Sequence, residues 1–413
     1  MDKYINRSEI NGFLEESEFL YKLGYGKGIP VYSSFGIHTI ERFIETFKML
    51  LLENNIYFYE NRVEKLIDKD YFHRVYLNIN EYTDENILFN NDYIMSDALI
   101  SNLRYLMSES AEEDKSVFSS SAIFRYKTSK LIPLYKDRYI YPVVQLDRKV
   151  KGKNVHAYIE QLKHLYLCFF REIGIDIFFL EAEEVPYYAK YELYFITGEG
   201  NGCFTKLGMV YVLSDEFKKN LGVSLDEELV DSGFSGRTLF KSIENTSLTY
   251  GKFMIHPNVT PIDFMYSCTH EFEFQPEIVA SKFALNAKRY SSTKLAYRQW
   301  KKSGIPFYIL FHDAVSLFFL EKESGYNEKL FQDIYSALDF LLNKKVSIVQ
   351  EVLEKSQHLL NFSKQQFVVH SCRACHKDFF YGFVYDNKGH HCLHCGREIE
   401  KTILNINPTK RFY

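Results

Sequence analysis

The sequence predicts an α+β fold in three successive parts: an antiparallel sheet with flanking helices, an α/β domain, and a small zinc-binding module. Three observations carry this prediction. Residues 119–147 contain two extended segments joined by a basic turn, which is the pattern of a long antiparallel hairpin. From residue 253 onward, helical and extended patterns alternate, which favours helices packed on a mixed sheet. Two Cys-x-x-Cys pairs follow in the last 45 or so residues.

The composition indicates a folded chain of two or three domains. Its 413 residues are more than one ordinary domain with a single core contains. An apolar share of 46% supports complete folding. The net charge of −4 gives no overall basic signal, so we expect any nucleic-acid contact in a local patch. The sequence has no apolar segment long enough to span a membrane and no signal-peptide core, so we expect a cytoplasmic protein that makes no membrane contact.

Amphipathic helices accompany the extended segments of the first part, which we assign to residues 1–251. Apolar residues from Ile40 to Leu51 recur at spacings of three and four and predict one apolar helix face. That face can pack on a sheet of the same chain or on a second copy. A second amphipathic helix is expected at 153–173, and strands follow it as far as Val212.

The second part, residues 252–345, is predicted to be an α/β domain. We expect a strand at 259–266, helices at 275–288 and 292–302, neighbouring strands at 306–311 and 315–321, and a long helix at 327–360. Gly304 is expected to end the second of these helices. The third part, residues 346–413, holds the end of the long helix and the paired cysteines.

Cations gather in and around the predicted hairpin. Arg125 lies on its first strand, and the turn contributes Lys127, Lys130, Lys136 and Arg138. A fixed guanidinium group binds phosphate oxygens in bidentate fashion, so this region favours a polyanionic ligand. Taken alone, the segment favours the simpler interpretation, a solvated basic hairpin.

A second candidate phosphate site lies within residues 231–251. Gly233 and Gly236 precede Arg237, which opens a predicted helix. Free amides at a helix start and a guanidinium group can converge on one phosphate. A simple glycine turn before a helix is the alternative.

The cysteine pairs form the most specific motif of the sequence. Cys372 and Cys375 are separated by sixteen residues from Cys392 and Cys395. This spacing allows two knuckles to close on one tetrahedral Zn²⁺ ion, and four thiolates leave no open position for catalysis. A disulfide or free thiols are the alternatives, and a cytoplasmic location disfavours the first.

In their order and spacing, these features resemble the class II aminoacyl-tRNA synthetases, and most closely the archaeal and eukaryotic type of prolyl-tRNA synthetase. Residues 28–59 resemble the first motif of that family, which forms its dimer interface. Arg125 is similar to the arginine of the second motif, which contacts the α-phosphate of ATP. Residues 231–251 resemble the third motif, in which Arg237 would hold the γ-phosphate. The segments HPNVTPIDFMY and YRQWKKSGIPFYI resemble the anticodon-binding domain.

The resemblance implies a ligase that activates an amino acid with ATP and Mg²⁺ and transfers it to tRNA or a related acceptor. The amino acid would be proline or another small one, and the protein would be a homodimer that pairs through the apolar face of the helix from Ile40 to Leu51 and its flanks. The family type also carries a C-terminal zinc domain and a terminal tyrosine near the active site, which corresponds here to Tyr413. Lys127, Arg138 and Gln145 fall in the other substrate-binding segments.

Several positions depart from the pattern of that family. Lys127 stands where the family has a glutamate that helps to hold ATP, and Gln145 lies in a segment that replaces a histidine-bearing one. Asp97 is the carboxylate expected to bind the substrate ammonium group. These departures support a second hypothesis, a synthetase paralogue without aminoacylation that binds tRNA or regulates. A third is a zinc-ribbon α/β protein whose basic hairpin binds nucleic acid.

Overall fold

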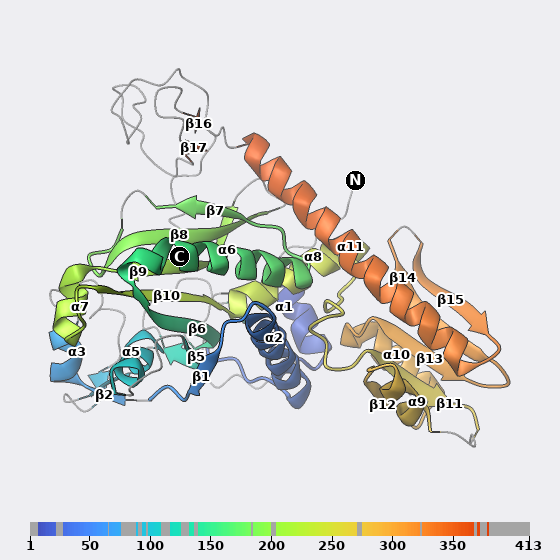
Figure 1. Ribbon diagram of the computed structural model, residues 1–413. Helices are drawn as coiled ribbons and strands as arrows, with labels where there is room; N and C mark the ends of the chain where they lie inside the picture. The colour runs from blue at the N-terminus through green and yellow to red at the C-terminus, as the bar shows by residue number, and fades with distance from the viewer. Residues whose placement is uncertain are drawn as a thin grey trace.

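The computed structural model describes a large domain, a smaller domain and a helix that packs against both (Figure 1). The described residues are 7–21, 28–64, 66–75, 88–89, 93–95, 98–108, 116–124, 132–135, 139–182, 185–199, 204–270, 275–322, 324–366, 370–371 and 378–379. Among them, no helix is long and apolar enough to cross a bilayer. The four paired cysteines lie outside these residues.

Seven strands form the sheet of the large domain, in the order β1-β5-β6-β10-β9-β8-β7. Their bounds are Phe58–Asn61 for β1, Ser116–Phe124 for β5, Tyr139–Lys151 for β6, Phe178–Glu181 for β7, Ala189–Gly198 for β8, Phe204–Leu213 for β9 and Glu227–Ser235 for β10. Neighbouring strands are antiparallel except β1 and β5, which are parallel. The antiparallel sheet and the hairpin of β5 and β6 are therefore confirmed.

Two long helices, α2 (Ser34–Glu53) and α6 (Val155–Glu172), cover one face of this sheet (Figure 1). Aromatic rings fill the space between them: the Phe47 ring centroid lies 4.9 Å from those of both Phe169 and Phe234. The apolar face of α2 packs inside its own chain, so the prediction that this face forms the contact between two copies is wrong. The short helix α1 (Arg7–Glu16) adds Ile10 and Leu14 to the same core.

Among the described residues, shorter helices cover one end of the opposite face. They are α3 (Lys69–Val75), α5 (Ala98–Ser108) and α7 (Asp215–Leu221), with a small sheet of β2 (Leu66–Asp68), β3 (Leu88–Phe89) and β4 (Tyr93–Met95) in the order β2-β4-β3. Leu103, Val117 and Tyr211 belong to the hydrophobic cluster beneath them. Next to this cluster the same face carries polar side chains, where Asn102 of α5 donates to Asp147 of β6 and Gln145 of β6 donates to Asp231 of β10.

The second domain has five strands in the order β12-β11-β13-β14-β15. Its elements are β11 (Phe264–Cys268), α9 (Pro276–Lys282), β12 (Ala287–Arg289), α10 (Thr293–Ser303), β13 (Phe307–Phe311), β14 (Val315–Glu321) and β15 (Gly325–Phe331). The strands β12, β11 and β13 are parallel, whereas β14 and β15 are antiparallel to their neighbours. The mixed sheet with helices agrees with the prediction for this region.

Two predicted elements of the second domain are wrong in extent. The helix expected at 275–288 ends at Lys282, and Ala287–Arg289 instead pairs with β11 as an edge strand. The long helix expected from residue 327 begins at Ile334, because Gly325–Phe331 pairs with β14. Gly325 has a φ of 78°, which glycine adopts without strain, and this tight turn makes the hairpin possible.

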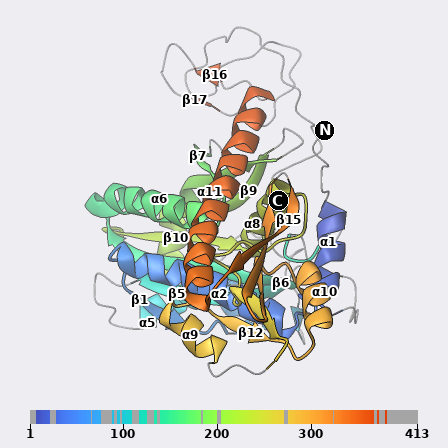
Figure 2. The ribbon, with the colours of Figure 1, turned by 90° about the vertical axis from the view of Figure 1, so that its right-hand side faces the viewer.

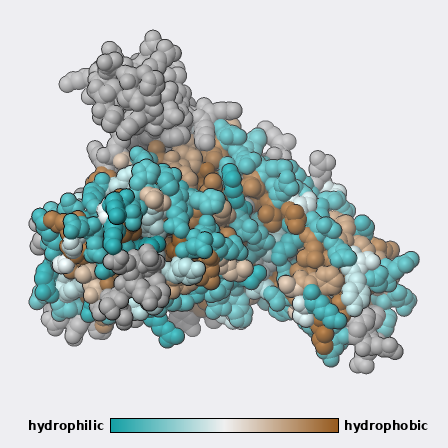
Figure 3. Space-filling model, viewed as in Figure 1, coloured by the Kyte–Doolittle hydropathy of each residue, from teal (hydrophilic) through white to brown (hydrophobic). Residues whose placement is uncertain are grey.

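The long helix α11 (Ile334–Gln366) packs against both domains, as the two ribbon views show (Figures 1 and 2). Its first turns bury Leu338 and Leu341 in the core of the second domain. Farther along, a Cβ atom added to Gly198 of β8 would lie 2.5 Å from the Leu359 carbonyl oxygen, so only glycine permits this close approach. The expected boundary between residues 345 and 346 falls inside this continuous helix. Hydrophilic side chains cover most of the surface in the view of Figure 1, with hydrophobic residues in separate patches (Figure 3).

Candidate active site

The candidate site lies on the face of the seven-stranded sheet opposite α2 and α6, where polar side chains adjoin the cluster beneath α5. Successive residues of a strand point to opposite faces, so Val144 and Leu146 of β6 join the aromatic core while Gln145 and Asp147 point the other way. On β10, Phe234 lies in that core, and Asp231 pairs directly with Asp147 across the ladder. The same two strands therefore supply both a core face and a polar face.

Arg237 lies where β10 passes into α8 (Gly236–Tyr250), as the sequence predicted for this helix start. Its Nε donates to the Tyr135 carbonyl oxygen at 3.3 Å and its Nη1 to the Lys206 carbonyl oxygen at 3.2 Å. The guanidinium group also lies over the Tyr135 ring, 5.2 Å from its centroid. A Cβ at Gly236 would come within 2.8 Å of the Tyr141 carbonyl oxygen, which explains the glycine beside the arginine. The arginine is held in one orientation.

Gln145 and two aspartates form the floor beside Arg237. Gln145 Nε2 donates to Asp231 Oδ1 at 2.9 Å. Asp147 is fully buried and accepts a hydrogen bond of 2.7 Å from Asn102 Nδ2, which also donates to Ser119 Oγ. Buried polar groups in such a network are held in defined orientations, because each loses a partner if it moves. The floor is therefore fixed, with Gln145 partly exposed and Asp147 and Asn102 fully buried beneath α5.

A partly buried ion pair lies on the same face of the sheet. Lys206 Nζ lies 3.1 Å from Glu192 Oε1 and 3.9 Å from the centroid of the Tyr194 ring. Burial, followed by the charge of Glu192, raises the pKa of Tyr194 above its ordinary value, so this phenol remains protonated at neutral pH. Because the Lys206 carbonyl oxygen binds Arg237, the ion pair and the arginine belong to one connected cluster.

The structure thus places two of the predicted site residues, Arg237 and Gln145, on α8 and β6, two elements that contact each other. The predicted residues Asp97, Arg125, Lys127, Arg138 and Tyr413 lie outside the described residues, as do the cysteines Cys372, Cys375, Cys392 and Cys395. Within the described part of the chain, no three His, Cys, Asp or Glu side chains gather closely enough to hold a metal ion.

Sequence reasoning missed several members of the cluster, namely Asn102, Glu192 and Lys206, and assigned no site role to Asp147 or Asp231. A usable signal was present in β6, where Gln145 and Asp147 alternate with the apolar Val144 and Leu146. Asn102 gave no such signal. Its contact with Asp147 depends on how α5 packs on the sheet, which the sequence of the helix does not show.

Comparisons with known proteins identify the fold. The structure of the Giardia lamblia prolyl-tRNA synthetase in complex with prolyl-adenylate matches with a TM-score of 0.69 and 12% sequence identity, over 84% of this chain and 80% of that one. The Cryptosporidium parvum prolyl-tRNA synthetase complexed with halofuginone and AMPPNP matches with a TM-score of 0.71 and 10% identity, over 87% and 82%. No protein-family model and no curated protein matches the sequence itself. The chain thus has the fold of the class II prolyl-tRNA synthetases.

Proposed function

We propose that this protein is an ATP-dependent ligase of the prolyl-tRNA synthetase type, which activates an amino acid as its adenylate and transfers it to tRNA or a related acceptor. The observation that carries the proposal is Arg237, anchored at the first turn of α8 beside a polar sheet floor, in a fold that prolyl-tRNA synthetases share. A guanidinium group held in this way is suited to bind phosphate oxygens without reorganisation.

The proposed reaction forms one bond and breaks one at the α-phosphorus of ATP. A carboxylate oxygen of the amino acid attacks this atom, and the bond to the bridging oxygen of the β-phosphate breaks, so pyrophosphate leaves. Arg237 would hold the terminal phosphate and Arg125 the α-phosphate, with Lys127 and Arg138 nearby. Mg²⁺, when bound with ATP, would neutralise part of the phosphate charge. Positioning and charge neutralisation are the main contributions that this chemistry needs.

The amino acid would lie on the floor formed by Gln145 and its neighbours. Its ammonium group requires a carboxylate partner, for which Asp97 is the sequence-based candidate and Asp231 a second one that hydrogen bonds to Gln145. Tyr413 would approach the same site. Proline or another small amino acid remains the proposed substrate.

The second domain offers support for an RNA partner. Helix α10 carries Lys294, Arg298, Lys301 and Lys302 and has no acidic residue, although the chain as a whole has a net charge of −4. Lys288 of the edge strand β12 adds a further exposed cation. Such a local basic surface fits the phosphate backbone of tRNA, which would bind here through its anticodon region.

One observation favours the second candidate function, a paralogue that binds tRNA or regulates without aminoacylation. Both described site residues already have partners within the chain: Arg237 donates to two main-chain carbonyl groups, and Gln145 donates to Asp231. Side chains occupied in this way can be retained for folding after catalysis is lost. The two functions differ in whether ATP binds at Arg237.

Two further features complete the proposal. Cys372, Cys375, Cys392 and Cys395 would bind one structural Zn²⁺ ion, on the strength of their spacing. The protein would be a homodimer, and since the apolar face of α2 is buried in its own chain, other residues must form the contact. Met49, Leu52 and Tyr57 are each more than half exposed and support this region as part of the interface.

Amino-acid-dependent exchange of pyrophosphate into ATP tests the ligase function. We expect exchange with one amino acid, and we expect Arg237→Ala to weaken ATP binding about ten-fold or more in calorimetric titration, since a charged hydrogen bond contributes roughly 1.5–3 kcal/mol. Arg42→Ala is the matched control, because Arg42 is exposed on α2, on the other side of the sheet. Equal and negligible ATP affinity in the folded wild type and both variants would exclude the ligase. Retained tRNA binding would then support the paralogue.

A further inference from the structure

The turn at residues 132–135 lies against the start of α8, where Arg237 is located. A hydrogen bond of 3.1 Å from Tyr135 N to the Ile132 carbonyl oxygen closes the turn. Leu134 has a φ of 64°, which residues other than glycine rarely adopt. Its side chain is 3% exposed and belongs to the core on the α2 and α6 side, so packing holds the turn in this strained conformation.

The turn and α8 approach each other as closely as their main chains allow. A Cβ atom added to Gly236 would lie 2.8 Å from the Tyr141 carbonyl oxygen and 3.2 Å from the Leu134 carbonyl oxygen. The Tyr135 ring packs on Phe240, a fully buried residue of α8, with 5.3 Å between the two ring centroids. The turn is therefore fixed to the first turn of this helix.

Tyr135 restrains the guanidinium group of Arg237 in two ways. Its carbonyl oxygen accepts from Arg237 Nε at 3.3 Å, and its ring centroid lies 5.2 Å from Arg237 Cζ. The Lys206 carbonyl oxygen accepts from Nη1 at 3.2 Å. Hydrogen bonds lie in the plane of a guanidinium group, whereas an aromatic ring attracts the cation from its face. The ring thus supplies a restraint that the hydrogen bonds do not.

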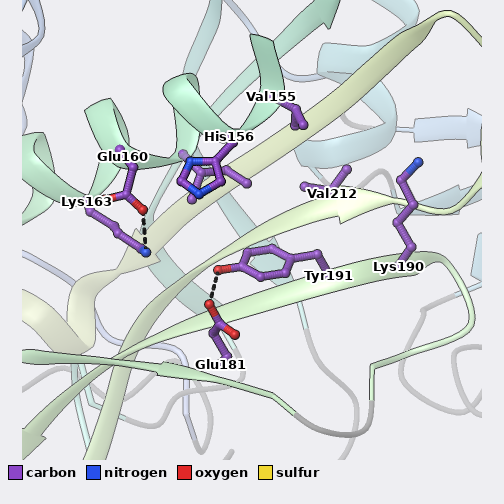
Figure 4. A pocket seen from close by; sticks show the side chains of 9 residues that line it. Val155, His156, Glu160, Lys163, Glu181, Lys190, Tyr191 and Val212 are labelled. Carbon is purple, nitrogen blue, oxygen red and sulfur yellow. Dashed lines mark hydrogen bonds and ion pairs between the residues drawn. The ribbon is translucent and has the colours of Figure 1, made fainter. Parts of the chain in front are cut away.

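Not every half-buried tyrosine of the large domain is held in this way. Tyr191 donates from its Oη to Glu181 at 3.2 Å, and its ring lines a hollow beside the first turns of α6 (Figure 4). None of the residues that line this hollow contacts the guanidinium group of Arg237 through the bonds given above. Because Tyr191 and Tyr135 both pack at the rim of the same core, Tyr191 provides a comparison for a ring outside the site.

We propose that Tyr135 is a positioning residue for Arg237. The role rests on the ligase function proposed above, in which Arg237 holds the terminal phosphate of ATP. The ring would set the plane of the guanidinium group before ATP binds, so that the group meets the phosphate oxygens without reorganisation. Tyr135 itself needs no contact with the nucleotide. Because AMP lacks the β- and γ-phosphates, the contribution of Tyr135 should appear with ATP and not with AMP.

Calorimetric titration of the full chain with ATP and Mg²⁺, and separately with AMP, tests this role. Tyr135→Leu keeps an apolar side chain on Phe240 but removes the ring, so ATP should bind about five-fold more weakly, with AMP affinity unchanged. Tyr135→Phe keeps the ring and should bind ATP as the wild type does. Tyr191→Leu is the matched control and should leave both affinities unchanged. Tyr135→Met, which also lacks the ring, should reproduce the leucine variant and replaces it if that variant does not fold.

A double variant separates positioning from a general effect on the fold. In Arg237→Ala the group that Tyr135 would position is gone, so adding Tyr135→Leu should lower ATP affinity no further. A further loss in the double variant, an equal loss of ATP and AMP affinity in Tyr135→Leu, or unchanged ATP affinity there would overturn the role of Tyr135. If Arg237→Ala alone still weakened ATP binding about ten-fold, the ligase function would stand without it. No binding of ATP by the wild-type chain would overturn both.

Discussion

The two faces of the seven-stranded sheet are built from alternate residues of the same strands, yet they are stabilised in different ways. On the α2 and α6 side, Phe234 contacts the rings of Phe43, Phe47 and Phe169, so each ring has several neighbours. On the polar side, the groups are held by directional hydrogen bonds, such as that from the amide of Asn102 to Asp147. Apolar packing is non-directional, whereas a buried hydrogen-bond network is specific and loses much when one member is removed.

The largest expected effect comes from the aromatic face. Phe234→Ala should lower the free energy of unfolding by about 3–5 kcal/mol, because it removes a ring that is 3% exposed and leaves a cavity among three others. Urea unfolding measures the difference. Leu330→Ala, at a side chain 63% exposed, serves as control and should change stability by less than about 0.5 kcal/mol. A loss under about 1 kcal/mol for Phe234→Ala would mean that the neighbouring rings collapse into the space.

The next largest expected effect is a dependence of the unfolding free energy on pH. It comes from His256, a polar residue on the apolar side of the sheet. His256 is fully buried near Gly174 and Val352, and burial, followed by the charge of Lys345, lowers its pKa to about 3. The unfolded chain binds a proton near pH 6.5, whereas the folded chain does not until about pH 3. Stability from the neutral ring is therefore complete above pH 6.5 and is lost as the pH falls below it, by up to about 1.4 kcal/mol per pH unit.

Unfolding curves between pH 7.5 and 4.5 test this. Subtracting the profile of His256→Gln, which has no titrating ring, isolates the contribution of the histidine. A wild-type profile parallel to that of the variant would show that His256 is not held neutral.

The smallest of the three effects concerns the polar face. Asn102→Ala removes donors to Asp147 and Ser119 and an acceptor for Asn61, so it should cost about 1–3 kcal/mol of unfolding free energy. Asn343→Ala is the matched control, at an exposed asparagine of α11. If Asn102→Ala cost as much as Phe234→Ala, the polar face would be as important to folding as the core. If it cost nothing, water would replace the lost amide.

The sequence by itself determined the elements whose signals are local. The apolar spacing of α2 and α6 follows the helical repeat, and α10 begins after Ser292, whose Oγ accepts from Leu295 N, and ends at Gly304 with a φ of 74°. The hairpin of β5 and β6 and the position of Arg237 at the start of α8 were predicted in the same way. Such signals depend on the conformational preferences of single residues and on neighbours three or four residues apart, and both can be read from the sequence.

Tertiary structure alone decided which surfaces meet. The strands β12 and β15 contain charged residues and little apolar alternation, so their sequences do not predict strands. They are extended because they pair with β11 and β14. The apolar face of α2 is buried against α6 and β10 of its own chain, a choice that its periodicity left open. The polar floor arises because Asn102, Asp147 and Asp231, far apart in sequence, share one face of the sheet once α5, β6 and β10 are in register. Contacts between distant segments depend on chain topology and packing, which local patterns do not encode.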